Sequence, residues 1–185
     1  TPIASDLQSD IIADSAYVAP SGGNFGFRVY GQLYQQSRKI AVKIDQVVKG
    51  FTGTSEANYK GNTILSSAII TTLEGVDGNG FWVRCAPCQD RYVAVLWGQT
   101  GGKIKGVVVD CGAAGSPTVG SLTTILTAKA STIPGPLHYF DLCESTSSGD
   151  IGGAANWLLV YRSTADAIRV ARLTSILGTQ WDVSV

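Results

Sequence analysis

The sequence has little charge and no surplus of either sign. Of its 185 residues, 14 are basic and 14 are acidic, and charged residues make up 15% of the chain, against about 25% in an average soluble protein. Without a basic surplus, little is available to neutralise a phosphate backbone, so nucleic acid is not an expected partner. The sequence also lacks any apolar run near the ~18 residues of a membrane-spanning helix, so we expect no membrane insertion.

Catalytic residue types are equally scarce. His138 is the one histidine, and no serine stands in the Gly-x-Ser-x-Gly turn that presents a nucleophile. Glu56, Glu74 and Glu144 are the only glutamates, so a glycosidase pair of carboxylates would have to be assembled by the fold. No phosphate loop or dinucleotide-binding motif is present. We therefore expect no enzyme, no catalytic residue and no cofactor; an enzyme whose site is not visible in the sequence remains an alternative.

Four cysteines, Cys85, Cys88, Cys111 and Cys143, are too few for a dense disulfide framework in a chain of this length. Reduced thiols are the favoured state. Cys85 and Cys88 have the spacing of half a zinc site, and Cys111 and Cys143 would have to supply the other two ligands. A redox pair would need the motif at the start of a helix, whereas here it lies between strand-like runs. The simplest interpretation is a hairpin turn with cysteines at the strand ends and no metal.

Residues 1–23 differ from the rest of the chain. Ile3, Leu7 and Ile11 recur every four residues, which is typical of one face of a helix, and a run of Pro and Gly ends the segment. We predict a short helix or extended arm followed by a linker. Together with Ile12, these side chains have no partner within the arm, so the arm must lie on the domain or on another subunit. We expect it to dock the chain in an assembly. The body is then expected to fold without residues 1–20.

Residues 24–185 change to a period of two, which predicts strands. Phe25, Phe27, Val29 and Leu33 fall on alternate positions. Further strands are expected over residues 40–44, 63–73, 81–85, 91–97, 103–110, 118–128, 137–143, 157–161, 167–173 and 181–185. About ten short strands separated by turn-forming residues are typical of an all-β protein, specifically an antiparallel β-sandwich or jelly roll.

The run 167–173 is the most ambiguous of these strands. Ile168 and Val170 alternate with Ala167, Arg169 and Ala171, which favours a strand. The alternation then breaks at residues 172 and 173, where Arg is followed by Leu.

Four tryptophans, Trp82, Trp97, Trp157 and Trp181, are spread over four of the expected strands. An exposed indole can stack on a sugar ring or anchor a protein interface. Core packing is the alternative, and we expect two or more of the four in the core. A free carbohydrate-binding, lectin-like module is therefore the second functional hypothesis.

Several features together favour a part of a virus particle. The chain is rich in Gly, Ser, Thr and Ala, its arm is unlike its body, and its last expected strand reaches the final residue. In style, through segments such as 78–84, 91–98 and 155–162, residues 24–185 resemble the head domain of a phage tail fibre, head fibre or spike, or a small jelly-roll virion protein. That resemblance implies a structural or attachment role, and it assigns no functional residue.

We therefore expect a non-enzymatic virion protein that forms a homo-oligomer, with a trimer favoured, through its arm. Its further partners would be other virion proteins or a host-surface glycan. Asp6, Asp10 and Asp14 give residues 1–27 three acids and no base, which would repel a genome and places the chain on the outside of the particle or in the tail. Loops on a rigid sandwich commonly carry recognition, so the candidate contact surfaces are residues 50–62, 98–102 and 145–153.

Overall fold

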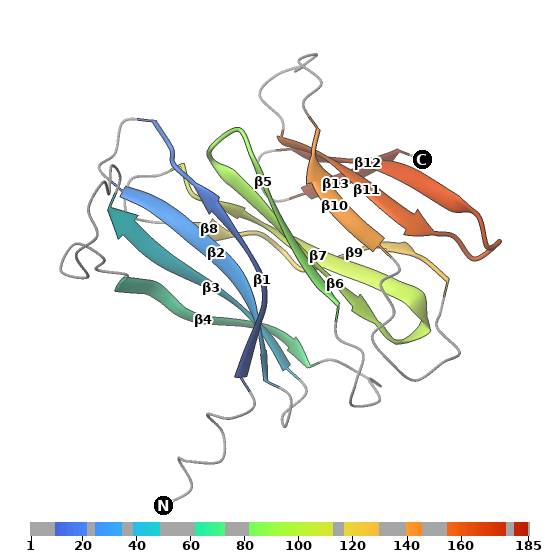
Figure 1. Cartoon of the computed structure of the whole chain (residues 1–185), viewed down its shortest axis with the longest axis horizontal. Helices are drawn as coiled ribbons and strands as arrows, with labels where there is room; N and C mark the ends of the chain where they lie inside the picture. The colour runs from blue at the N-terminus through green and yellow to red at the C-terminus, as the bar shows by residue number, and fades with distance from the viewer. Residues whose placement is uncertain are drawn as a thin grey trace, which may run out of the picture.

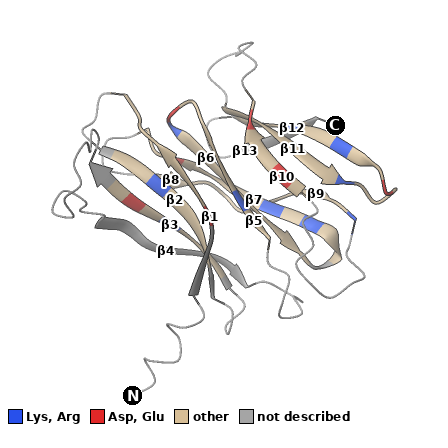
Figure 2. Cartoon of the chain, in the orientation of Figure 1, with Lys and Arg blue, Asp and Glu red and all other residues tan. Residues whose placement is uncertain are grey.

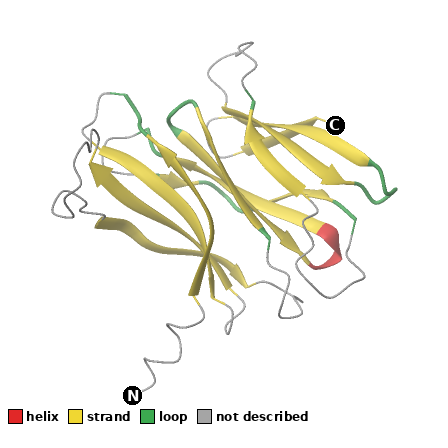
Figure 3. Ribbon diagram, viewed as in Figure 1, coloured by secondary structure: helices red, strands yellow, loops and turns green. Residues whose placement is uncertain are grey.

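The structure is a computed structural model that describes residues 10–21, 25–34, 39–48, 62–72, 82–112, 117–129, 140–145, 155–176 and 180–184. These residues are almost entirely strand (Figure 3). The elements are β1 (Asp10–Val18), β2 (Phe25–Tyr34), β3 (Lys39–Val48), β4 (Asn62–Thr72), β5 (Val83–Cys88), β6 (Tyr92–Gln99), η2 (Thr100–Gly102), β7 (Lys103–Asp110), β8 (Thr118–Val119), β9 (Thr123–Thr127), β10 (Phe140–Glu144), β11 (Ala155–Arg162), β12 (Ile168–Ile176) and β13 (Gln180–Ser184). The all-β prediction is confirmed. None of the described residues forms a helix long and apolar enough to cross a membrane.

The strands form three antiparallel sheets stacked as layers (Figure 1). Sheet A has the order β1-β2-β3-β4, sheet B the order β5-β6-β7-β8 with β9 also paired to β7, and sheet C the order β10-β11-β12-β13. Within each sheet, strands that are consecutive in the sequence pair with each other, except that β9 pairs with β7 and not with β8. A jelly roll needs Greek-key connections, so stacked meanders fit these sheet orders better than the jelly-roll alternative. The strand predicted over residues 118–128 divides into β8 and β9.

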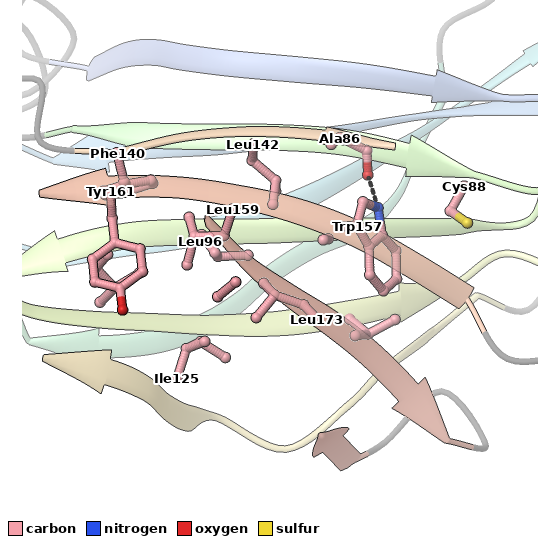
Figure 4. Close-up of a cluster of buried hydrophobic side chains, with 14 of the residues drawn as sticks. Ala86, Cys88, Leu96, Ile125, Phe140, Leu142, Trp157, Leu159, Tyr161 and Leu173 are labelled. Carbon is pink, nitrogen blue, oxygen red and sulfur yellow. Dashed lines mark hydrogen bonds between the residues drawn. The ribbon is translucent and has the colours of Figure 1, made fainter. Parts of the chain in front are cut away.

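Sheet B is the middle layer because its central strand is apolar on both faces. Every residue of β6 is buried, and successive side chains of a strand point to opposite faces. Val93, Val95 and Trp97 belong to the cluster shared with sheet A, whereas Ala94 and Leu96 belong to the cluster shared with sheet C. We call these clusters the A–B core and the B–C core; part of the latter is drawn in Figure 4.

Glycine allows sheets A and B to approach closely at one point. A Cβ added to Gly31 of β2 would lie 2.7 Å from Cγ1 of Val83 in β5. Real Cβ contacts are essentially never this short, so with any larger residue at position 31 the Val83 side chain or one of the two strands would have to shift. The A–B core therefore depends on a glycine in the middle of a strand, where glycine is otherwise unfavourable.

Strand β5 is an edge of sheet B, and both outer sheets cover that edge. The backbone N–H of Cys85 donates to Asp14 Oδ2 of β1 at 2.8 Å, and the N–H of Gln89 donates to Glu144 Oε1 of β10 at 3.0 Å. Between them, Pro87 has no N–H to satisfy, which is why proline is tolerated on an edge strand. Carboxylates from two different sheets thus block an edge that would otherwise template pairing with another chain.

The N-terminal prediction needs correction. Residues 10–18 are strand β1, which pairs with β2 from Asp10↔Tyr34 to Val18↔Phe27, so the helical alternative is wrong for this stretch and the extended one holds. Ala16 and Val18 are buried in the A–B core. The boundary at residue 23 therefore separates two parts of the same sheet. Deleting residues 1–20 would remove a strand, which contradicts the expectation that the body folds without them.

Candidate functional site

The tryptophans proposed to stack on a ligand are mostly structural. Trp97 and Trp157 are 1% and 0% exposed, which confirms that at least two of the four lie in the core. Trp157 Nε1 donates to the carbonyl oxygens of Ala86 and Pro87 at 3.1 and 3.2 Å, tying sheet C to β5 (Figure 4). Trp181 lies in β13, and its side chain is outside the described residues.

Trp82 is the remaining candidate, and it is half-buried against the B–C core. Its Nε1 donates to the carbonyl oxygen of Phe140 at 2.7 Å. The guanidinium of Arg84 lies 3.5 Å from the ring centroid, so a cation already occupies one face of the indole. Arg84 is held there by a 2.8 Å ion pair with Asp141. A sugar would have to displace this arrangement in order to stack.

The four cysteines do not come together. Cys85 packs against the A–B core and Cys88 lies in the B–C core, because a spacing of three in a strand places two side chains on opposite faces. Cys111 is buried in the A–B core, Cys143 is exposed, and all four are free. Across the described part of the chain, no group of three or more His, Cys, Asp and Glu could hold a metal ion. The zinc alternative therefore has no support from this fold.

The buried thiols are also poor nucleophiles. Burial raises the pKa of the Cys111 thiol to about 12, with the charge of Asp110 adding to the effect. Burial, followed by the charge of Asp14, raises the pKa of Cys85 still further. Because the thiolate is the reactive form, neither side chain is suited to redox or nucleophilic chemistry near neutral pH.

Other predicted residues can be placed only in part. Ile3, Leu7 and His138 lie outside the described residues. Ile11 and Ile12 lie in β1, where their backbones pair with Leu33 and Gln32, and their side chains are not described. Of the three loops proposed as contact surfaces, residues 98–102 are described; they comprise the end of β6 and the turn η2.

The clearest exposed surface is one that the sequence did not indicate. On the side of sheet C facing away from sheet B, Ile168, Val170 and Val160 are 71%, 52% and 39% exposed. Val160 and Val170 are direct partners across β11 and β12. Leu158, Arg162 and Arg172 lie on the same side by register, because residues directly opposite each other in an antiparallel pair share a face. We call these six residues the outer face of sheet C.

The inward-facing residues of β12 show that the alternation of this strand continues. Ala171, Leu173 and Ser175 are buried, so the strand keeps its period of two through residues 172 and 173 where the sequence pattern looked broken. The two β-branched residues before them point outward. The signal was present in the sequence, but small Ala171 was a weaker marker of the buried side than Ile168 or Val170.

A network of charges holds one end of this face in place. In the turn between β11 and β12, Asp166 accepts a hydrogen bond from Arg162 Nη2 at 2.8 Å and another from Lys129 Nζ. The hydrogen bond from Lys129 is the main reason that the pKa of Asp166 is below its usual value. Asp166 has a positive φ of 65°, which an aspartate tolerates in a turn. The hairpin is thereby fixed at the point where the apolar side chains begin.

The outer face of sheet A has a different character. There Tyr30 donates from its hydroxyl to Asp45 Oδ1 at 3.5 Å, and the Arg28 guanidinium lies 5.2 Å from the Tyr30 ring centroid. Lys43 is the direct partner of Tyr30 across β2 and β3. Charged and aromatic groups interact with one another on this side, so the outer face of sheet C is the stronger candidate for an interface.

Comparison with known proteins adds little to this description. No family model matches the chain, and no curated protein matches it. Among solved structures, the chain is similar to the NanB sialidase from Streptococcus pneumoniae, with a TM-score of 0.49 and 13% identity; the match covers 90% of this chain and 22% of that one. The match thus covers about a fifth of that protein's length. We draw no conclusion about the activity of this chain from the likeness.

Proposed function

We propose that this chain is a non-enzymatic structural module of a virion, of the kind found in phage appendages, and that it works as a homo-oligomer. In this proposal the outer face of sheet C is buried against a neighbouring copy. Other virion proteins or a host surface would then be contacted by the parts that remain exposed.

The observation that carries the proposal is the exposure of three β-branched side chains on one sheet. Single exposed apolar residues are ordinary, but a contiguous exposed apolar patch marks an interaction surface. Val160, Val170 and Ile168 are adjacent on β11 and β12, and Val and Ile are the residues that pack best on a pleated surface. The face is therefore suited to receive another flat surface.

A second copy is the occupant that best suits this face. Sheet C already packs face to face on sheet B, and a second sheet laid on its outer side would continue the same stacking, at a layer spacing of about 10 Å. The low charge of the chain reduces the repulsion between identical subunits. Arg172 lies beside the apolar residues and donates to Asn156 Oδ1 at 3.3 Å. In this proposal its guanidinium also meets a carboxylate of the neighbouring copy.

The test is the mass of the full chain in solution, measured by light scattering after size-exclusion chromatography. We expect a closed oligomer for the wild type and a monomer for Ile168→Lys combined with Val170→Lys. Leu122→Lys is the matched control, because Leu122 is 37% exposed but lies between β8 and β9 on sheet B. Far-UV circular dichroism should be unchanged in all three proteins.

The oligomer number also says how the face is used. A dimer would mean that the outer face of sheet C meets itself, and a trimer or larger ring would mean that it meets a different surface of the next copy. A wild-type monomer at high concentration, or an oligomer that survives both lysine substitutions, would contradict the proposal.

A further inference from the structure

One end of sheet B carries a group of polar side chains on a single face. Strand register places them together: Gln99 is opposite Lys103, Trp97 is opposite Lys105, and β9 continues the row with Thr127 opposite Lys103 and Thr124 opposite Lys105. All of these residues lie on the side of the sheet that faces sheet A. We call Trp97, Gln99, Lys103, Lys105, Thr124 and Thr127 the polar end; it adjoins the turn η2, and blue positions gather at this end of β7 in Figure 2.

Two hydrogen-bond donors in the polar end are buried without an acceptor. Among the residues that the structure describes, Trp97 Nε1 and Gln99 Nε2 have no hydrogen-bond partner, although the two residues are only 1% and 6% exposed. A buried donor without an acceptor destabilises the folded chain, and two on one face of the same strand are unusual. Neither nitrogen atom is open to solvent in this structure, so an oxygen atom from a bound molecule reaches them only when the side chains that cover them move aside.

The two lysines of the polar end also lack an ion-pair partner within the described residues. Lys103 is exposed and Lys105 is half-buried, and neither forms an ion pair with any residue that the structure describes. They are two residues apart on β7, so their side chains emerge on the same face about 7 Å apart. Thr124 and Thr127 are exposed beside them and add two hydroxyl groups.

At the opposite end of β6 and β7, a positively charged side chain is paired with a carboxylate. There Arg91 Nε and Nη2 donate to the two carboxylate oxygens of Asp110, both at 2.8 Å. The bidentate pair satisfies both charges within the chain. At the polar end, cations and buried N–H groups gather with no carboxylate among the six residues.

We propose that the polar end binds an acidic polysaccharide, through its sulfate or carboxylate groups. Lys103 and Lys105 meet the anionic groups, the threonine hydroxyls meet sugar hydroxyls, and Trp97 Nε1 and Gln99 Nε2 donate to oxygen atoms at the base of the site. Single-stranded nucleic acid fits less well, because it requires aromatic faces for base stacking and the ring of Trp97 is buried. The site is on a different sheet from the outer face of sheet C and does not depend on self-association.

Titration calorimetry on the full chain tests the proposal, with three glycan probes of similar length. Heparin oligosaccharide carries sulfate and carboxylate, hyaluronate oligosaccharide carries carboxylate alone, and dextran is neutral. We expect binding to heparin, no binding to dextran, and a hyaluronate result that tells whether carboxylate suffices. Binding to heparin should weaken as salt rises.

Variants locate the site. Lys103→Gln with Lys105→Gln should weaken binding about tenfold or more, because two charge-assisted contacts are lost. Lys129→Gln is the matched control, since it removes one positive charge from a lysine that is paired with Asp166, and it should leave the affinity unchanged. Gln99→Leu should weaken binding about threefold while leaving the melting temperature unchanged or higher, because it removes a buried unpaired donor.

Three outcomes would overturn the inference. They are the absence of heparin binding at low salt, an equal loss of affinity in Lys129→Gln and the double variant, and tighter binding to oligothymidylate than to any of the glycans. Because the experiment reads ligand affinity, its failure can be distinguished from a failure of the oligomer proposal, which reads mass.

Discussion

The two cores on either side of sheet B are alike in composition but differ in how their buried tryptophans are hydrogen-bonded. Each contains one fully buried tryptophan, Trp157 in the B–C core and Trp97 in the A–B core. The indole N–H of Trp157 donates to two carbonyl oxygens of β5, whereas that of Trp97 has no acceptor within the described part of the chain. The indole of the B–C core is therefore fully hydrogen-bonded, although Ser175 Oγ on the inward side of β12 has no partner among the described residues. The A–B core leads into the polar end, where hydrogen-bonding capacity is left for a molecule from outside.

The largest expected effects test whether the two cores unfold together. Leu173 in the B–C core and Ile44 in the A–B core are both 0% exposed. Leu173→Ala and Ile44→Ala should each lower the free energy of unfolding by about 2–5 kcal/mol, because each removes buried apolar volume and leaves a cavity. In urea titrations followed by circular dichroism and by tryptophan fluorescence, the two signals should change together, since sheet B is common to both cores.

A separation of the two signals would contradict the prediction that the two cores unfold together. If Ile44→Ala split the transition and Leu173→Ala did not, the A–B core would be an independently unfolding unit. The double variant supplies a control, because distant sites should have additive effects within about 0.5 kcal/mol.

A smaller effect distinguishes the two tryptophans directly. Trp157→Phe and Trp97→Phe remove the same volume, so their difference reports the indole N–H. Trp157→Phe deprives the carbonyl oxygens of Ala86 and Pro87 of a donor, whereas Trp97→Phe removes a donor that has no acceptor. We expect Trp157→Phe to be the more destabilising by about 1–2 kcal/mol in urea titration. Equal losses would mean that the N–H of Trp97 is satisfied in solution.

The sequence was a good guide to the strands and a poor one to their stacking. The period of two predicted nearly every strand, because alternation is imposed by burial on one face. At the N-terminus a different pattern misled. A spacing of four residues, as in Ile3, Leu7 and Ile11, fits one side of a strand as well as one face of a helix. The apolar run from Tyr92 to Trp97 carried the signal for a middle layer buried on both faces, a pattern that a two-layer sandwich does not need.

The candidate sites were less accessible to prediction. The outer face of sheet C depends on which side of β12 is buried, and that is decided by packing between Ala171 and the B–C core. The polar end depends on the register of three strands, which brings Lys103 and Lys105 beside Gln99 and Thr127. The loop at residues 98–102 was expected to make contacts, and the structure places it next to the polar end. That the loop makes them is still a prediction.

The smallest predicted effect concerns pH and the charged end of the B–C core. Arg91 lies 4.8 Å from the ring centroid of Tyr92 and pairs with Asp110. Burial opposes the ionisation of Asp110, but hydrogen bonds from Arg91 and from the N–H of Gly112 outweigh it, so the pKa of this carboxyl is below its usual value. A lowered pKa means that the pair stabilises the folded chain above pH ~4, where an unfolded aspartate is ionised, and that this stabilisation is lost as pH falls through the lower folded value.

Because Arg91 is exposed and Asp110 is only half-buried, the contribution of the pair to the free energy of unfolding should be under about 1 kcal/mol. Asp110→Asn and Arg91→Gln should each flatten the acid side of the curve of melting temperature against pH, and the double variant should flatten it no further, since both changes remove the same interaction. An acid side that keeps its slope in either single variant would show that other carboxylates control the stability there. In that case the contrast between the two ends of sheet B would rest on the unpaired lysines alone.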